Sequence, residues 1–127
     1  MKKIIHTKKA PAPIGPYNQA VLFNNTLYTS GQIAMDADSG ALLTDSIEEE
    51  TKKVMENLIA ILEEAGMGFD NVVKTSIFLS DMNNFNQVNE VYASYFDEAN
   101  APARETVQVA RLPKDVNVEI SVVAMKG

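Results

Sequence analysis

Only two arginines occur in this chain, Arg104 and Arg111, and the first of them lies at the head of a strand-like stretch. That stretch, residues 102–109 with the sequence PARETVQV, is rich in Val and Thr and begins with proline, which indicates a strand. A guanidinium group is permanently charged and planar, and it can donate two parallel hydrogen bonds to one carboxylate. Arg104 is therefore a candidate anchor for an anionic ligand. The alternative is an exposed residue at a strand end, paired with Asp97 or Glu98.

The second candidate for chemistry is Glu119, the single carboxylate in the apolar run 118–124. Apolar neighbours raise the pKa of a carboxyl group and so suit it to general acid or base work. The residue types alone leave an ordinary position on the surface of a sheet equally open. An anchor such as Arg104 together with such an acid favours catalysis, because a protein that only binds its ligand needs no proton-handling group.

Weaker candidates are Tyr17, the pair Ser30 and Gly31, and Asn89. Tyr17 ends the proline-rich segment 10–17 and offers a phenolic hydroxyl from a stiff backbone. Ser30 offers a small hydroxyl, and Gly31 leaves its backbone N–H open to a closely approaching ligand. Each of these residues also occurs as a plain turn or helix-edge residue. The sequence contains no phosphate-binding loop, dinucleotide fingerprint or metal-binding motif.

The composition excludes several classes of protein. A formal charge of −6 over 127 residues argues against nucleic acid or an anionic membrane as the main partner. The absence of cysteine excludes disulfides, thiol nucleophiles and Cys-ligated metals. A single histidine, His6, argues against a histidine metal cluster or a Ser-His-Asp triad. An acidic protein that binds an anionic small molecule needs a local cation, which again points to Arg104.

The chain has no repeat, low-complexity tract or linker, and we expect residues 1–127 to form a single domain. The lysine-rich start is followed by only two consecutive apolar residues, Ile4 and Ile5, so we expect no secretory signal. No window approaches the roughly 20 apolar residues of a membrane span. We therefore expect a cytoplasmic protein.

The hydrophobic pattern predicts six strands and two helices in the order βββαβαββ. Ser46 and Glu49 have the spacing of a capping box that opens the first helix, and Gly66 fits its end. We expect the acidic run 48–50 to face solvent, where it favours the positive end of the helix dipole. The predicted strands lie at about 4–5, 20–23, 26–29, 71–79, 104–111 and 117–124, and the helices at 46–66 and from about 83.

Two helices can cover only one face of such a sheet. The expected fold is therefore α+β, a single mixed β-sheet with two helices packed on one face. Along the strand from 104, Arg104 and Thr106 share one side and Glu105 the other. In the last strand Glu119 lies on a semi-polar side, as expected where subunits pack or a wet cleft forms. Oligomerisation is therefore expected.

Several motifs together, in order and spacing, closely resemble the RidA (YjgF-like) family of reactive-intermediate (enamine/imine) deaminases. The resemblance covers residues 2–125 and implies a chorismate-mutase-like fold. It also implies a homotrimer with sheets facing inward and ligand clefts between adjacent subunits. The motifs are APAPIGPY at 10–17, LYTSGQI at 27–33, VVKTSIFL at 72–79 with DMN at 81–83, VNEVY at 88–92, PARETVQVARLPK at 102–114 and VEI at 118–120.

The resemblance also implies an activity, the hydrolysis of reactive 2-imino acids to 2-oxo acids and ammonia. The substrates are 2-iminopropanoate and 2-iminobutanoate, formed from 2-aminoacrylate and 2-aminocrotonate, and neither cofactor nor metal is required. Arg104 matches the carboxylate-binding arginine of the family, and Glu119 matches the glutamate that positions the attacking water. The remaining cleft residues match Tyr17, Ser30, Gly31, Asn89 and Thr106.

The sequence departs from the family pattern just after the arginine. Many deaminases have Ser at the next position and often Cys at the one after, where this chain has Glu105 and Thr106. Strand alternation predicts that Glu105 points away from the side of Arg104. A bulge would instead turn Glu105 inward, where it would neutralise the anchor.

Other functions stay open at this stage. The same fold can serve a non-catalytic trimeric binder of small carboxylates with a regulatory or stress-protective role. Nuclease activity fits poorly with an acidic chain that lacks a basic, aromatic-rich face. A chorismate mutase would need more cations for its dicarboxylate substrate.

Overall fold

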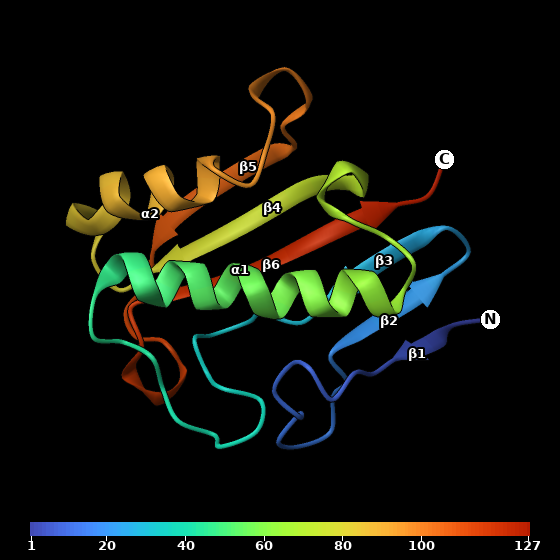
Figure 1. Cartoon of the computed structure of the whole chain (residues 1–127), viewed down its shortest axis with the longest axis horizontal. Helices are drawn as coiled ribbons and strands as arrows, with labels where there is room; N and C mark the ends of the chain where they lie inside the picture. Colours follow the sequence, from blue (N-terminus) through green and yellow to red (C-terminus); the bar gives the residue numbers. More distant parts are fainter.

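The scaffold is a mixed sheet of six strands with helices α1 (Ile47–Glu64) and α2 (Phe85–Ala93) lying across one face (Figure 1). The structure is a computed structural model that describes residues 1–127. Neither helix combines the length and apolar character needed to cross a membrane. In sheet order the strands are β1 (Lys3–Ile5), β2 (Ala20–Phe23), β3 (Thr26–Thr29), β6 (Val118–Met125), β4 (Val72–Leu79) and β5 (Ala103–Gln108). The predicted α+β class and the order of the elements are confirmed.

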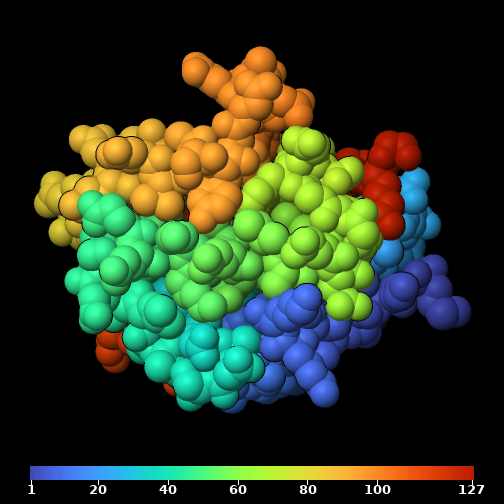
Figure 2. Space-filling view, viewed as in Figure 1, coloured from blue at the N-terminus to red at the C-terminus, as the bar shows by residue number.

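The sheet is antiparallel except at one edge. β5 pairs with β4 in parallel, with Arg104 opposite Thr75, and every other neighbouring pair is antiparallel. A parallel pair needs a crossover, and α2 supplies it between β4 and β5 (Figure 1). In the space-filling view the side chains of the helical layer cover the sheet on this side (Figure 2).

The end of β5 and the start of α2 differ from the predicted positions. β5 ends at Gln108 rather than at residue 111, because its partner β4 ends at Leu79 and the ladder cannot continue. The second helix begins at Phe85, after a 3-10 turn over Met82–Asn84. The backbone N–H of Met82 in that turn donates to the side chain of Gln108 at 2.9 Å. This hydrogen bond links the turn before α2 to the last residue of β5.

Helix α1 begins and ends where the sequence predicts. The hydroxyl of Ser46 accepts a hydrogen bond from the backbone N–H of Glu49 at 3.1 Å. Beyond the last turn Gly66 adopts a φ of 73°, a left-handed conformation that glycine takes without a steric penalty. The apolar stripe of the helix, including Val54, Leu58 and Ile61, is fully buried against the sheet.

Glu50 contradicts the prediction that residues 48–50 all face solvent. Its side chain is completely buried, and its carboxylate accepts three hydrogen bonds. The donors are the backbone N–H of Asn117 at 2.7 Å, the Asn117 side-chain amide at 2.8 Å and the backbone N–H of Val118 at 2.9 Å. Glu50 lies one helical turn before Val54 on the buried stripe, which explains its direction. The carboxylate ties the start of α1 to the start of β6.

The two faces of β6 differ sharply in exposure. Val118, Ile120, Val122 and Ala124 point into the core beneath the helices. On the other face of the sheet large apolar side chains are exposed, namely Tyr28 at 52%, Val107 at 44% and Met125 at 46%. The helices therefore cover one face only, as predicted, and the apolar residues of the second face are not covered within one chain.

The buried carboxylate of Glu50 can be tested directly. We expect Glu50→Ala to lower the free energy of unfolding by about 3 kcal/mol or more, because the buried donors at Asn117 and Val118 lose their acceptor. Urea unfolding at one fixed protein concentration measures the change. The matched control Glu48→Ala removes an exposed acid from the same helical turn and should cost less than about 1 kcal/mol. Equal losses in the two variants would refute the assigned role of Glu50.

Candidate active site

Arg104 lies near the start of β5, on the side of the sheet that faces α2. Its Nη1 donates to Oδ1 of Asn89 at 2.7 Å. Its guanidinium carbon lies 5.1 Å from the ring centroid of Tyr92 and 5.6 Å from that of Phe85, so both aromatic faces stabilise the cation. These contacts hold the guanidinium in place and leave most of its five N–H donors free.

Arg104 has no acidic partner. The ion pairs of the structure join Lys53 to Asp36, Lys74 to Glu105 and Arg111 to Asp115. The alternative interpretation, in which Asp97 or Glu98 neutralises Arg104, is therefore wrong for this structure. In a chain with a charge of −6, an arginine held only by an amide and two aromatic rings is open to an anionic ligand.

An open cavity of about 740 Å³ lies beside Arg104. Part of its wall comes from α2 and the turn after it, and part from the segment that leads into β5. One acid, Glu98, is among the residues that line it. The lining residues are Asn89, Tyr92, Ala93, Phe96, Glu98, Ala101, Pro102 and Arg104. The predicted residues Asn89 and Arg104 therefore lie together.

Glu105 points away from Arg104, as strand alternation predicted. Its carboxylate accepts from the hydroxyl of Ser76 at 2.5 Å and lies 3.4 Å from Nζ of Lys74. The Ser76 hydrogen bond and the Lys74 charge hold the pKa of Glu105 below its ordinary value. The departure from the family pattern at this position does not neutralise the anchor.

Thr106 lies on the same side of β5 as Arg104 but does not line the cavity. Its Oγ1 is covered by neighbouring atoms and has no hydrogen-bond partner. The chain therefore does not present this hydroxyl to a ligand beside Arg104.

Glu119 lies on the opposite face of the sheet, on β6 and across from Phe78. Its carboxyl group packs against the backbone of Gly31, where an added Cβ would come within 2.7 Å of the Glu119 Cδ. Any side chain at position 31 would therefore displace the carboxyl group. The burial of Glu119 raises the pKa of its carboxyl group, in the predicted direction.

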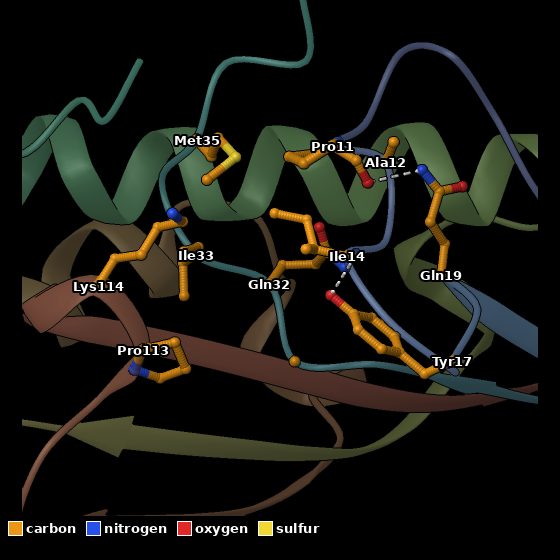
Figure 3. A pocket seen from close by; sticks show the side chains of 11 residues that line it. Pro11, Ala12, Ile14, Tyr17, Gln19, Gln32, Ile33, Met35, Pro113 and Lys114 are labelled. Carbon is orange, nitrogen blue, oxygen red and sulfur yellow. Dashed lines mark hydrogen bonds between the residues drawn. The ribbon is translucent and has the colours of Figure 1, made fainter. Parts of the chain in front are cut away.

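Tyr17 and Ser30 lie on the same side of the molecule as Gly31 and are fixed by the proline-rich loop. The hydroxyl of Ser30 donates to the carbonyl oxygen of Asn18 at 2.6 Å. The hydroxyl of Tyr17 accepts from the backbone N–H of Ile14 at 3.4 Å. Tyr17 and Gly31 both line a second cavity, with a volume of about 320 Å³ (Figure 3).

Within one chain the predicted site residues form two separate groups. Asn89 and Arg104 lie beside the helical layer at one edge of the sheet, whereas Glu119 and Gly31 lie together elsewhere. β4 lies between β5 and β6, and Arg104 and Glu119 project from opposite faces of the sheet. A single chain therefore does not bring the anchor and the acid together.

Sequence reasoning missed the aromatic pair beneath Arg104. Phe85 and Tyr92 lie seven residues apart in the predicted second helix, a spacing that usually indicates packing into a core. Tyr92 is buried, and its hydroxyl donates to Oγ1 of Thr75 at 3.0 Å, yet its ring also faces the guanidinium. The parallel pairing of Thr75 with Arg104 brings these groups together, and no local sequence signal reports that register.

Comparison with known proteins agrees with the motifs. Residues 7–126 match the sequence model of the family described as endoribonuclease L-PSP. The chain is 50% identical over 127 residues to the human 2-iminobutanoate/2-iminopropanoate deaminase, covering 100% of this chain and 92% of that protein. It is 56% identical over 124 residues to a RutC family protein of Synechocystis, covering 97% and 95% of the two chains.

Solved structures give the same relationship. TdcF of Escherichia coli with bound serine superposes with a TM-score of 0.92 at 41% identity, covering 98% of this chain and 99% of that one. The YjgF gene product of E. coli gives a TM-score of 0.92 at 42% identity, again covering 98% and 99%. The chain therefore belongs to the RidA (YjgF-like) family, also described as endoribonuclease L-PSP.

Proposed function

We propose that the protein is a deaminase that hydrolyses reactive 2-imino acids, among them 2-iminobutanoate and 2-iminopropanoate, to 2-oxo acids and ammonia. The observation that carries the proposal is Arg104, a positioned guanidinium without an acidic partner at the wall of a cavity. Mammalian relatives with this activity in their names are 49–50% identical to the chain over its full length, which supports the proposal.

The role of Arg104 is to hold the substrate carboxylate. One N–H is engaged by Asn89, and the remaining donors can form a bidentate pair with a carboxylate. The rings of Tyr92 and Phe85 fix the plane of the guanidinium group before the substrate arrives. Fixing the carboxylate also fixes the imine carbon relative to the protein, which lowers the entropic cost of the attack.

The role of Glu119 is to align a water molecule and accept its proton as the oxygen attacks C2 of the imine. Burial raises the pKa of this carboxyl group, which makes it a better proton acceptor than an exposed glutamate. The attack forms a tetrahedral carbinolamine, whose nitrogen is held by backbone groups near Gly31 and Thr106. Return of the proton from Glu119 to nitrogen breaks the C–N bond, and the hydroxyl loses its proton as the carbonyl forms, which releases ammonia and the 2-oxo acid.

The complete site is shared between two copies of the chain. Tyr17, Ser30, Gly31 and Glu119 come from one copy, and Asn89, Arg104 and Thr106 come from the next. This proposal is supported by the separation of Arg104 and Glu119 on opposite faces of one sheet. A head-to-tail contact closes into a ring when its rotation allows, and the ring proposed here is a homotrimer with its sheets facing inward. The exposed apolar side chains on the second face would be covered in that ring.

The anchor is tested by coupling the protein to a threonine dehydratase and following 2-oxobutanoate while semicarbazide traps the free imine. We expect wild type to accelerate keto-acid release and Arg104→Ala to lower kcat/KM about 10²-fold or more, the loss of a charged hydrogen-bonded pair. The control Lys52→Ala removes an exposed cation of α1 and should retain full activity. A correctly assembled wild-type protein without any acceleration would be a non-catalytic carboxylate binder instead.

The shared site is tested by mixing two inactive variants. Arg104→Ala and Glu119→Gln should each lose activity, the second by about 10²–10⁴-fold, the usual worth of a proton-handling group. When the two chains are unfolded together and reassembled as a trimer, about a quarter of the clefts combine an intact Arg104 with an intact Glu119. We expect activity to return to about that fraction of wild type. If well-assembled hybrids stay inactive, Arg104 and Glu119 must act from the same chain, and the shared site is refuted.

The packing of Glu119 on Gly31 gives a third test. In Gly31→Ala the new methyl group displaces the Glu119 carboxyl group, and we expect kcat to fall at least about tenfold. The pKa of Glu119, followed by NMR, should also fall toward its ordinary value as the group moves into water. Gly68→Ala is the matched control, because an added Cβ there meets nothing within 4 Å. An unchanged Glu119 pKa in Gly31→Ala would count against this packing.

A further inference from the structure

The cavity lined by Tyr17 and Gly31 is larger than 2-iminopropanoate or 2-iminobutanoate requires. Its volume of about 320 Å³ falls within the range of about 300–1,000 Å³ typical of small-molecule pockets. The ethyl group of 2-iminobutanoate would occupy only a small part of it. The cavity also adjoins the proposed reaction centre, because the backbone of Gly31 is both part of its wall and the surface on which Glu119 packs.

The wall of this cavity is apolar apart from a few polar groups. Ile14, Ile33 and Met35 contribute aliphatic surface, and no acidic residue lines the cavity. In Figure 3 Tyr17 and Lys114 stand on opposite sides of the view, with Gln32 between them. A ligand side chain in this cavity would therefore meet aliphatic surface, an amide and an ammonium group.

Gln32 is a largely buried residue whose side-chain amide has no partner within the protein. Only 6% of the residue is exposed, and its side chain forms no hydrogen bond, although its backbone pairs with Ile120. Gln19, another buried glutamine, differs in this respect. Its side-chain amide accepts from the backbone N–H of Thr7 and donates to three backbone carbonyl groups. The amide atoms of Gln32 are not among the fully buried unpaired polar atoms of the structure, so they keep contact with solvent. The Gln32 amide thus has free hydrogen-bonding capacity at the cavity wall.

Lys114 is the only charged residue that lines the cavity, and it takes part in no ion pair. It has a left-handed backbone with φ 55°, and Asp115 follows with φ 57°. Two successive non-glycine residues in this region are unfavourable and persist only where neighbouring contacts hold them. Arg111 forms an exposed ion pair with Asp115 in this turn, with Nε 2.5 Å from one carboxylate oxygen and Nη2 3.0 Å from the other. The turn places Lys114 at the cavity wall.

We propose that this cavity is a side-chain subsite for 2-imino acids that end in a second carboxylate, with Lys114 and Gln32 binding that carboxylate. The proposal rests on the function proposed above. The substrate class is the 2-imino dicarboxylic acids, of which 2-iminoglutarate is an example. Water adds at C2 and ammonia leaves, as for the smaller substrates, so the product is a 2-oxo dicarboxylic acid. The second carboxylate takes no part in the bond changes and serves recognition alone.

The polar groups of the subsite decide its preference. A purely aliphatic side chain would fill the apolar wall, but it would cut Gln32 and Lys114 off from water without offering them partners. A carboxylate accepts from the amide N–H of Gln32 and from the ammonium of Lys114, so both groups are paired. Because no acid lines the cavity, nothing in its wall repels the incoming charge.

The catalytic test compares two substrates in each variant. 2-Iminobutanoate is made by a threonine dehydratase and 2-iminoglutarate by an L-glutamate oxidase, with semicarbazide trapping in both. We expect wild type to hydrolyse 2-iminoglutarate, and Lys114→Met to lower the ratio of kcat/KM for 2-iminoglutarate over 2-iminobutanoate at least tenfold. Gln32→Leu, which keeps the side-chain volume, should lower the same ratio. Lys52→Met removes an exposed cation of α1 and should leave the ratio unchanged.

A binding test separates this proposal from the function on which it rests. Calorimetry of the assembled wild-type protein should show 2-oxoglutarate binding at least tenfold more tightly than 2-oxobutanoate, and Lys114→Met should remove the preference. Equal affinities in wild type, or a preference that survives Lys114→Met, would overturn the subsite. Failure to hydrolyse 2-iminobutanoate would overturn the deaminase function, and the calorimetry would still decide the subsite. Lys114 is exposed, so its replacement leaves the core intact even where Gln32→Leu fails to fold.

Discussion

The two-residue repeat of the strands is the constraint on which the rest of this protein depends. In β6 it sends Val118 and Ile120 into the core and turns Glu119 to the other face. In β5, paired in parallel with β4, it turns Arg104 toward α2 and Glu105 away from it. A one-residue shift of β6 would bury Glu119 in the core, and the same shift of β5 would turn Glu105 instead of Arg104 toward α2. The packing of apolar residues thus fixes the directions of the reactive ones.

Local signals in the sequence were enough for most of the fold, and long-range pairings account for what they missed. The Ser46 cap and the Gly66 end follow from nearby residues, and both were predicted correctly. Glu50 was predicted wrongly, because its exposure depends on donors 67 and 68 residues further along the chain. The end of β5 likewise depends on where its partner β4 stops. A pattern of residue types reports periodicity but not the partner that a strand or a side chain finds.

In the candidate site, too, some residues are visible from local sequence signals and others only from long-range contacts. Arg104 and Glu119 became candidates through residue chemistry, since one of only two arginines in an acidic chain and a single acid in an apolar strand are visible in the sequence. Gln32 and Lys114 gave no such signal. Gln32 is notable only because its amide has no protein partner at a cavity wall, and Lys114 only because a turn with two left-handed residues places it at the same wall. Both properties arise from tertiary packing.

Imine hydrolysis explains why so few groups suffice in the proposed site. Imines react with water unaided, so the protein has to supply orientation, one proton-handling group and a fixed anchor rather than a strong nucleophile. Orientation is costly to obtain from a flexible surface, and this chain places its anchor and its acid on opposite faces of a rigid sheet. In the proposed trimer, assembly is the step that completes the site. An isolated chain would hold Arg104 and Glu119 in place but would not bring them to the same substrate. The proposed activity therefore depends on assembly, which also buries the exposed apolar face of the sheet.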